Sequence, residues 1–188
     1  NHPLYFGNIG MHGNYAANEA VNSCDLLISI GTRFNDRITG KLGTFASKAK
    51  IIHIDIDTAA ISKNVTVDIP IVGDAKDAIQ LMLEIAQHEK ACDTEPWILK
   101  MESWRKKYPI KMEEKEKLVP IQVIEAINEF FDNPIVTTDV GQNQMWTTQF
   151  LELRGKRQLL TSGGLGTMGY GLPSAIGAAI GNPGREVV

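Results

Sequence analysis

The chain has 188 residues, 43% of them hydrophobic and 22% charged, which is ordinary for a globular protein of one large or two small domains. A net charge of −3 at pH 7 and a single basic cluster at 105–107 argue against nucleic acid as a partner. No apolar run approaches the roughly 18 residues that a membrane-spanning helix needs, so we expect no membrane partner. The start is no signal peptide, and the solitary Cys24 and Cys92 favour a reducing compartment. We therefore expect a cytoplasmic protein without structural zinc.

The first part of the chain predicts a helix followed by strands. Residues 15–23 carry small alanines that suit a closely packed helix. Residues 25–31 and 50–55 are apolar with little alternation, which is typical of strands buried on both faces and predicts a parallel sheet. His53 lies inside the second of these strands, and we expect it to be a core histidine whose hydrogen bonds are satisfied.

A third strand is predicted over 69–72, where Pro70 suits an edge position because proline cannot donate to a neighbouring strand. Asp74 then caps a helix over 75–89. Strands and helices alternate along the chain, so we predict an α/β protein with parallel sheets and flanking helices.

Residues 92–118 indicate a charged linker, because charges of both signs alternate there, and Trp97, Trp104 and Tyr108 among those charges suggest a helix that docks loosely. Beyond it we predict a helix and two strand–helix pairs, over 120–131, 134–138 with 142–153, and 157–161 with the helix that begins near Pro173. A new strand starts at 186–188, where the chain stops. We therefore expect a fragment: the C-terminal part of one domain (1–91), the linker, and the truncated N-terminal part of the next domain (119–188).

Residues that follow the strands are the candidates for chemistry, because open α/β sheets bind ligands beyond the carboxyl ends of their strands. Glycine gives access to backbone, an arginine fork meets a diphosphate through two hydrogen bonds, and a carboxylate accepts from a ribose. Residues of these kinds follow the first three strands: Gly31, Thr32, Arg33, Asp36, Arg37, Asp55 and Asp74. Together they favour a dinucleotide-type site, with helix capping and solvated arginines as the alternatives.

A glycine-rich turn follows the strand at 157–161. It contains G-x-G-x-x-G at Gly164, Gly166 and Gly169, the spacing of a dinucleotide-binding loop. The acidic residue that a nicotinamide site needs about twenty residues later would fall at or beyond Val188, so that interpretation cannot be completed. A turn needed only for tight packing is the alternative.

A second candidate lies at residues 140–143, which close one predicted strand and open a helix. Backbone N–H groups and side-chain amides at such a helix start can bind a diphosphate. An ordinary helix cap is the alternative interpretation.

Two motifs of the second half resemble the thiamine-diphosphate enzymes and, among them, the large catalytic subunits of the acetohydroxyacid (acetolactate) synthases. They are D-V-G-Q-N-Q-M-W at 139–146 and S-G-G-L-G-T-M-G-Y-G-L-P at 162–173. The resemblance runs through nearly the whole chain. Four upstream motifs are similar to that family's flavin-binding middle domain: G-M-H-G at 10–13, G-T-R-F-N-D-R-I-T-G at 31–40, I-I-H-I-D-I-D at 51–57 and I-P-I-V-G-D-A at 69–75.

The resemblance implies two cofactor sites. FAD, in a structural role, would contact Gly10, Met11, His12, Gly31, Thr32, Arg33, Asp36, Arg37, Asp55, Ile56, Asp74 and Ala75. Thiamine diphosphate would contact Val140, Gly141, Gln142 and Asn143 on its diphosphate side and Gly166 and Met168 on its aminopyrimidine side. Met168 is the expected catalytic residue, because its bulk would keep the cofactor in the bent, reactive form; packing under the glycine turn is its alternative role. The Mg²⁺ ligands of the family lie outside this chain, and no metal site is expected within it.

The resemblance also implies an activity. Two pyruvates, or pyruvate and 2-ketobutyrate, would condense with loss of CO₂ in branched-chain amino-acid biosynthesis. The partners would be small 2-keto acids, further copies in a homo-oligomer, and a regulatory subunit, while the fragment alone is expected to be inactive. A glyoxylate carboligase and a non-catalytic nucleotide-binding module are the alternatives.

Overall fold

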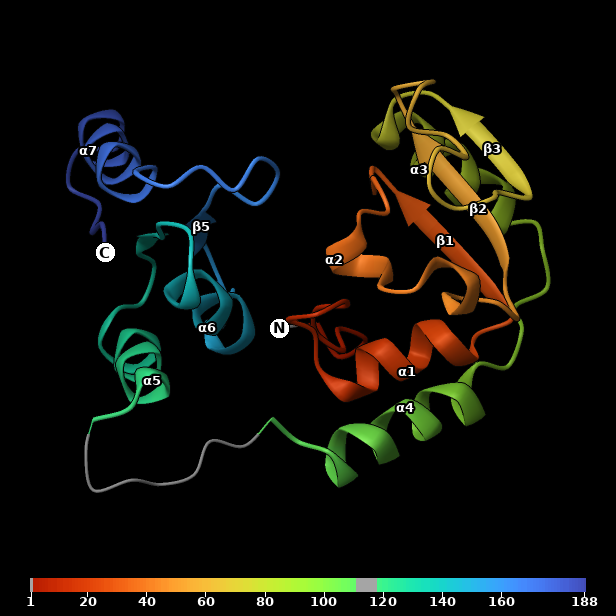
Figure 1. Ribbon diagram of the computed structural model, residues 1–188, viewed down its shortest axis with the longest axis horizontal. Helices are drawn as coiled ribbons and strands as arrows, with labels where there is room; N and C mark the ends of the chain where they lie inside the picture. Colours follow the sequence, from red (N-terminus) through yellow and green to blue (C-terminus); the bar gives the residue numbers. More distant parts are fainter. Residues whose placement is uncertain (1, 111–117) are drawn as a thin grey trace. The chain divides into compact units, whose positions relative to one another are not determined.

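The computed structural model describes residues 2–110 and 118–188, which belong to two compact units (Figure 1). One unit is Phe6–Ile110; the other is Lys111–Val188 with Asn1–Tyr5, of which residue 1 and residues 111–117 lie outside the described part. Each unit is a parallel sheet with helices packed on it. The α/β prediction is confirmed.

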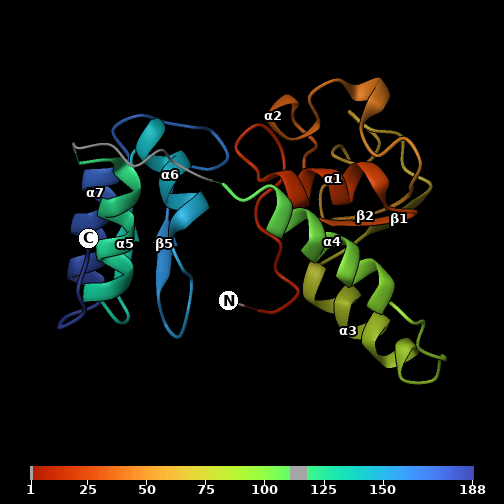
Figure 2. The same ribbon diagram turned by 90° about the horizontal axis from the view of Figure 1, so that it is seen from below.

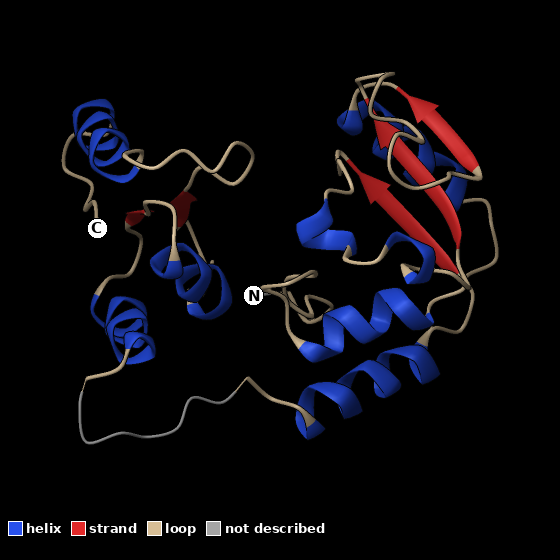
Figure 3. Ribbon diagram, in the orientation of Figure 1, coloured by secondary structure: helices blue, strands red, loops and turns tan. Residues whose placement is uncertain are grey.

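The unit Phe6–Ile110 contains a three-stranded parallel sheet in the order β1 (Leu26–Ile30), β2 (Lys50–Asp55) and β3 (Ile69–Val72). Figure 3 shows its three arrows pointing the same way. The strand with Pro70 lies at an edge of this sheet, as predicted, because its N–H is missing from the ladder.

Five helical segments belong to this unit: α1 (Tyr15–Ser23), α2 (Asp36–Thr39), the short 3₁₀ helix Leu42–Thr44, α3 (Ala75–Ala86) and α4 (Glu95–Lys107). Figures 1 and 2 show α4 beside α1, and the rings of Tyr15 and Tyr108 approach to 4.1 Å there. The helix that Trp97, Trp104 and Tyr108 suggest within 92–118 is therefore present, and it packs on this unit. Residues 111–117 of that stretch lie outside the described residues.

The helix α3 ends at Ala86, three residues before the predicted end at 89. The reason is visible in its backbone hydrogen bonds. His88 and Glu89 donate to Ile85 and Ala86 at a spacing of three residues, so the chain leaves the helix in a tightened turn.

A core cluster of the unit contains Phe34, Phe45, Ala46 and Ile51. His53 is fully buried beside it, with its ring 5.0 Å from that of Phe34. The predicted burial is confirmed, but the predicted satisfaction of its hydrogen bonds is wrong. Neither ring nitrogen has a hydrogen-bond partner among the described residues, and Nε2 lies 3.8 Å from the Asp55 carboxylate. The Asp55 carboxylate lies beyond hydrogen-bond distance, and the hydroxyl of Ser29, which pairs with His53 in the register of β1 and β2, makes no hydrogen bond within the described part of the chain either.

The second unit repeats a strand–turn–helix pattern: α5 (Pro120–Phe130), β4 (Ile135–Thr137), α6 (Gln142–Phe150), β5 (Gln158–Leu160) and α7 (Gly171–Gly181). The two strands are parallel, and Ile135 also pairs in parallel with Val187 on its other side. The strand predicted to start at 186 therefore begins to form beside β4. None of the helices within 2–110 and 118–188 has the length and apolar character to cross a membrane.

Two predicted helix ends in this unit also differ from the structure. α6 stops at Phe150, before the predicted 153, because the backbone beyond it bonds elsewhere: the Glu152 N–H donates to Asn128 Oδ1 and its carbonyl accepts from Arg157. α5 ends at Phe130, one residue before the predicted end, which is within the usual uncertainty of helix termini.

Candidate functional sites

The first group of predicted site residues lies at the carboxyl edge of the sheet in Phe6–Ile110. The register pairs Ile30 with Ile54 and Asp55 with Val72, so the residues that follow the three strands leave the sheet at one edge. They are Gly31, Thr32 and Arg33 after β1, Asp55 as the last residue of β2 with Ile56 after it, and Asp74 and Ala75 after β3. The sheet topology therefore brings them together.

Both aspartates at this edge hold local backbone. Asp74 caps α3, with Oδ1 accepting from the N–H of Lys76 at 2.8 Å and of Asp77 at 3.3 Å. Asp55 Oδ1 accepts from the Asp57 N–H at 2.8 Å. The capping prediction for Asp74 is confirmed, and each carboxylate accepts from backbone N–H groups two or three residues further along the chain.

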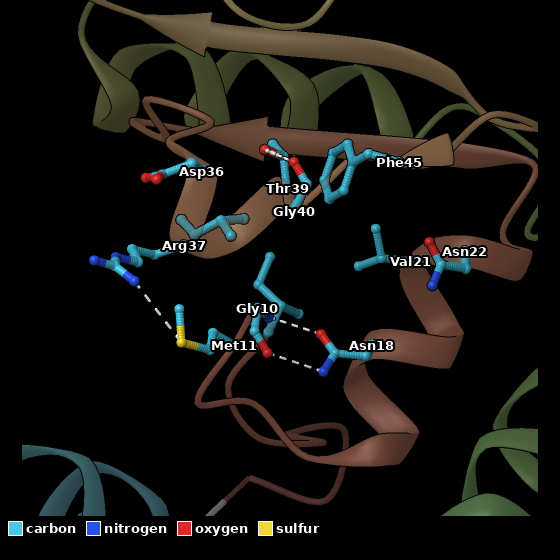
Figure 4. A pocket seen from close by; sticks show the side chains of 12 residues that line it. Gly10, Met11, Asn18, Val21, Asn22, Asp36, Arg37, Thr39, Gly40 and Phe45 are labelled. Atoms are coloured by element: carbon cyan, nitrogen blue, oxygen red, sulfur yellow. Dashed lines mark hydrogen bonds between the residues drawn. The ribbon is translucent and has the colours of Figure 1, made fainter. Parts of the chain in front are cut away.

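The second group lies around a cavity of about 450 Å³ between the loop at 10–11, α1 and α2 (Figure 4). Gly10, Met11, Asp36 and Arg37 line it, and the Arg37 guanidinium lies 3.9 Å from the Met11 sulfur. The other predicted flavin residues do not line this cavity. The exposed His12 is adjacent in sequence but is not part of the wall.

Close backbone packing explains the first glycine of G-M-H-G. The Met11 N–H donates to the Arg37 carbonyl at 2.7 Å. Gly10 has φ +90°, and a Cβ there would overlap the Arg37 carbonyl and come within 2.8 Å of Ile38 Cα. Only glycine lets the loop lie this close to α2.

One residue of this cavity escaped sequence reasoning. Asn18 of α1 brackets Gly10 with two hydrogen bonds: its Oδ1 accepts from the Gly10 N–H at 2.7 Å, and its Nδ2 donates to the Gly10 carbonyl at 3.0 Å (Figure 4). A polar residue in the middle of an alanine-rich helix is the signal that could have indicated it.

The third group lies beyond β4 and β5. Gly141 has φ +136° and precedes the first residue of α6, Gln142, so the predicted strand–turn–helix junction at 140–143 is present. The first N–H groups of an α-helix have no partner within the helix and attract anions. A Cβ at Gly141 would meet no atom within 4 Å, so space is open at this junction. This donor set fits a diphosphate.

Asn143 has a second environment. It contributes to an apolar cavity of about 340 Å³ between α5 and α6, together with Val119, Val123, Ile124 and Trp146. Asn143 therefore belongs both to the start of α6 and to the wall of this cavity.

The glycine turn at 162–170 bends back on itself at its start. Ser162 Oγ accepts from the Thr167 N–H at 3.0 Å, and the Ser162 carbonyl accepts from the Gly166 N–H at 3.2 Å. Gly166 has φ +66°, and a Cβ there would meet open space. Met168 is 79% exposed, so it fills no gap among the described residues and the packing alternative for it is not supported. An open glycine and an exposed apolar side chain fit an aromatic cofactor ring.

Sequence reasoning missed the side chains that hold this turn. Asp139 accepts from three backbone N–H groups, and these bonds, from Val140, Gly171 and Gly169 in order of size, hold the pKa of its carboxyl below the usual range. Gln144 Nε2 donates to Thr161 Oγ1 at 2.7 Å and to the Ser162 carbonyl at 3.3 Å. The position of Asp139 directly after a strand was the available signal.

A metal cluster was not expected in this chain. Within 2–110 and 118–188, no group of three or more His, Cys, Asp or Glu side chains lies close enough together to hold a metal ion.

Comparison with known families gives two matches, in the order of the two units. Residues 1–82 match the central domain of thiamine pyrophosphate enzymes, and residues 139–188 match their C-terminal thiamine pyrophosphate-binding domain.

Curated relatives are similar over the whole chain. A probable acetolactate synthase large subunit of Methanocaldococcus jannaschii is 47% identical over 100% of this chain and 33% of its own length. The acetolactate synthase large subunit of Cyanidium caldarium is 44% identical over 99% of this chain and 32% of its own. Acetolactate synthase 2, chloroplastic, of Brassica napus is 46% identical over 96% of this chain and 29% of its own length. The chain thus spans about a third of the length of the relatives it matches.

Proposed function

We propose that this chain, which belongs to the thiamine pyrophosphate enzymes, carries part of the cofactor machinery of an acetolactate synthase large subunit. The whole protein would join two pyruvates, or pyruvate and 2-ketobutyrate, with loss of CO₂. The observation that carries the proposal is the identity of 42–47% to acetolactate synthase large subunits across both units. The two groups at strand ends and the group around the 450 Å³ cavity are compatible with it.

Thiamine diphosphate would lie across the carboxyl ends of β4 and β5. The start of α6 would hold the diphosphate through Gly141, Gln142 and Asn143, with Val140 closing the strand before them. Gly166 and Met168 would contact the aminopyrimidine. When bound, the cofactor supplies a nucleophilic carbon and an electron sink for the loss of CO₂.

In this proposal, the residues of this chain bind the cofactor and orient it. The N–H groups at the start of α6 offset the charge of the diphosphate, and Met168 provides an apolar surface that limits the shape a bound ring can take. Mg²⁺ would be held by residues outside the chain.

FAD would be held by the unit Phe6–Ile110 in a structural role. The donor chemistry fits: Arg37 lines the 450 Å³ cavity with Gly10 and Met11, and Arg33 lies at the sheet edge with Asp55. Arginine at such an edge can meet a diphosphate bidentately. A homo-oligomer, a regulatory subunit, branched-chain amino-acid biosynthesis and a cytoplasmic location complete the proposal, although the Brassica napus relative is named chloroplastic.

The test is an assay of the purified whole protein with pyruvate, thiamine diphosphate, Mg²⁺ and FAD, with acetolactate as the measured product. Formation that depends on thiamine diphosphate and scales with protein concentration is expected. Cofactor-dependent consumption of glyoxylate without acetolactate would favour the glyoxylate carboligase, and absence of both activities in cofactor-loaded protein would favour the non-catalytic module. A flavin spectrum in the purified protein tests the FAD site separately.

A further inference from the structure

Asp139 makes an unusual set of contacts at the end of β4. Its Oδ1 accepts from its neighbour Val140 at 2.7 Å and from the Gly169 N–H at 3.0 Å, and its Oδ2 accepts from the Gly169 N–H at 3.0 Å and the Gly171 N–H at 3.1 Å. Two of these donors lie about thirty residues downstream, in the glycine turn and at the first residue of α7. One carboxylate thus ties the end of one strand to the turn that follows the next strand.

The approach of Asp139 to α7 is too close for any side chain between them. A Cβ at Gly171 would lie 2.8 Å from the Asp139 nitrogen and 3.1 Å from the Thr138 carbonyl carbon. The residue before the helix, Tyr170, gives no side-chain cap to α7. Asp139 therefore caps this helix from another strand, and its negative charge occupies the positive start of α7.

The contact with Asp139 makes the start of α7 different from the start of α6. The start of α7 already holds an anion that belongs to the protein, whereas the start of α6 follows a glycine with open space around it. The Gly171 N–H group at the start of α7 is therefore occupied, and the N–H groups at the start of α6 are the ones open to a diphosphate.

The other end of the turn is held as well. Gln144 donates to Thr161 and to the Ser162 carbonyl, and Thr138 Oγ1 donates to Thr161 Oγ1 at 2.8 Å. Between the two fastened ends, Leu165 is 94% exposed and Met168 79% exposed. Backbone is fixed where the turn meets the sheet, and the apolar side chains at its tip remain accessible.

We propose that Asp139 is a positioning residue for thiamine diphosphate: it fixes the backbone at Gly169 and Gly171 so that Met168, one residue earlier, is presented to the aminopyrimidine ring. The proposal rests on the function proposed above. Asp139 would touch neither cofactor nor substrate. It would act through the hydrogen bonds that it accepts from the N–H groups of Gly169 and Gly171.

The variants are made in the whole protein. Asp139→Asn keeps the shape and one acceptor oxygen but places an NH₂ group against a backbone N–H, and Asp139→Ala removes both acceptors. Glu129→Gln, an exposed carboxylate on α5, is the control for loss of one negative charge in the same unit. Each protein is first shown to be folded by circular dichroism.

Two quantities are measured. Calorimetric titration gives the Kd for thiamine diphosphate at saturating Mg²⁺, and hydrogen exchange of the peptide covering 166–171 gives the order of the turn without cofactor. We expect Asp139→Asn to raise the Kd about tenfold, which corresponds to about 1.4 kcal/mol, and to speed the exchange of that peptide. Asp139→Ala should exceed both effects, KM for pyruvate at saturating cofactor should change less than about twofold, and Glu129→Gln should match the unsubstituted protein.

Folded Asp139 variants with the Kd of the unsubstituted protein would overturn the inference and leave the proposed function standing. Failure of both variants to fold would assign Asp139 to folding alone and would overturn it as well. Absence of thiamine diphosphate binding in the unsubstituted protein would instead overturn the proposed function, and this inference with it.

Discussion

Replacement of Arg157 by methionine should lower the free energy of unfolding of the second unit far more than the same change at the nearby Arg154. Arg157 is 5% exposed, and its guanidinium donates to Asn128 Oδ1 at 2.6 Å, to the Asn128 carbonyl at 3.2 Å, to the Glu152 carbonyl at 2.8 Å and to the Phe131 carbonyl. These acceptors lie at the end of α5 and just beyond α6. One side chain thus joins the ends of two helices.

The size of the effect follows from these contacts. Methionine keeps the aliphatic stem and removes the donors, so the loss is that of hydrogen bonds to a charged group, about 1.5–3 kcal/mol each. The bonds are not additive, because the Asn128 carbonyl also accepts from Arg154 at 2.7 Å. We expect Arg157→Met to lower the free energy of unfolding by about 3–5 kcal/mol. Arg154 has a side chain 49% exposed and an ion pair with Glu152 at 3.6 Å, so Arg154→Met should cost about 1 kcal/mol or less.

Tryptophan fluorescence can report this unit alone. The chain has three tryptophans, and two of them, Trp97 and Trp104, lie in α4 of the other unit. In a background with both changed to phenylalanine, Trp146 of α6 is the sole reporter during urea unfolding. With a slope of about 1–3 kcal/mol per molar urea, Arg157→Met should lower the midpoint by more than about 1 M. Equal midpoints for the Arg157 and Arg154 variants would refute the reasoning from burial.

Three further outcomes can be measured. Met168→Ala should change the free energy of unfolding by less than about 0.5 kcal/mol, because the side chain is exposed. The same variant should lower kcat of the whole enzyme roughly a hundredfold. A loss of about 2–5 kcal/mol in the free energy of unfolding would indicate packing instead. In urea melts, Gly171→Ala should destabilise through its contact with Asp139, whereas Gly177→Ala, in open space within α7, should stabilise by about 0.5–1 kcal/mol. The pKa of Asp139 is lowered in the folded protein, so the stabilisation from its carboxylate is present above the unfolded pKa of about 3.9. This stabilisation is lost as the pH falls through the native pKa. An NMR titration of the Asp139 side-chain carboxyl carbon with a midpoint at or above about 3.9 would contradict this.

Most elements could be predicted because their signals are local. The helix at 15–23 and the strands at 50–55 and 69–72 have the predicted bounds, since each is an apolar or small-residue run that ends at a turn residue. The site groups at the sheet edge followed from the rule that strand ends gather at one edge.

The helix α4 shows how aromatic residues among charges can indicate a docked helix. Its apolar surface is not a stripe of aliphatic residues: Trp97 and Trp104 meet edge to face at 5.9 Å, with the Lys100 ammonium within 5.5 Å of both rings. A charge between two aromatics looks solvated in the sequence but forms one packed group through cation–π contacts. The charges of 92–118 thus indicated a linker, while its aromatic residues indicated the helix that packs on the first unit.

The role of a glycine could not be predicted from its spacing, because glycine is required for two different physical reasons. At Gly10 a Cβ would overlap the backbone of α2, so the residue is required by the protein's own packing. At Gly166 a Cβ would meet open space and the residue is required by its positive φ, so this backbone can face a ligand. Spacing such as G-x-G-x-x-G does not distinguish these cases. What distinguishes them is the partner across the gap, as with Asp139, whose carboxylate reaches across about thirty residues of sequence to fix Gly169.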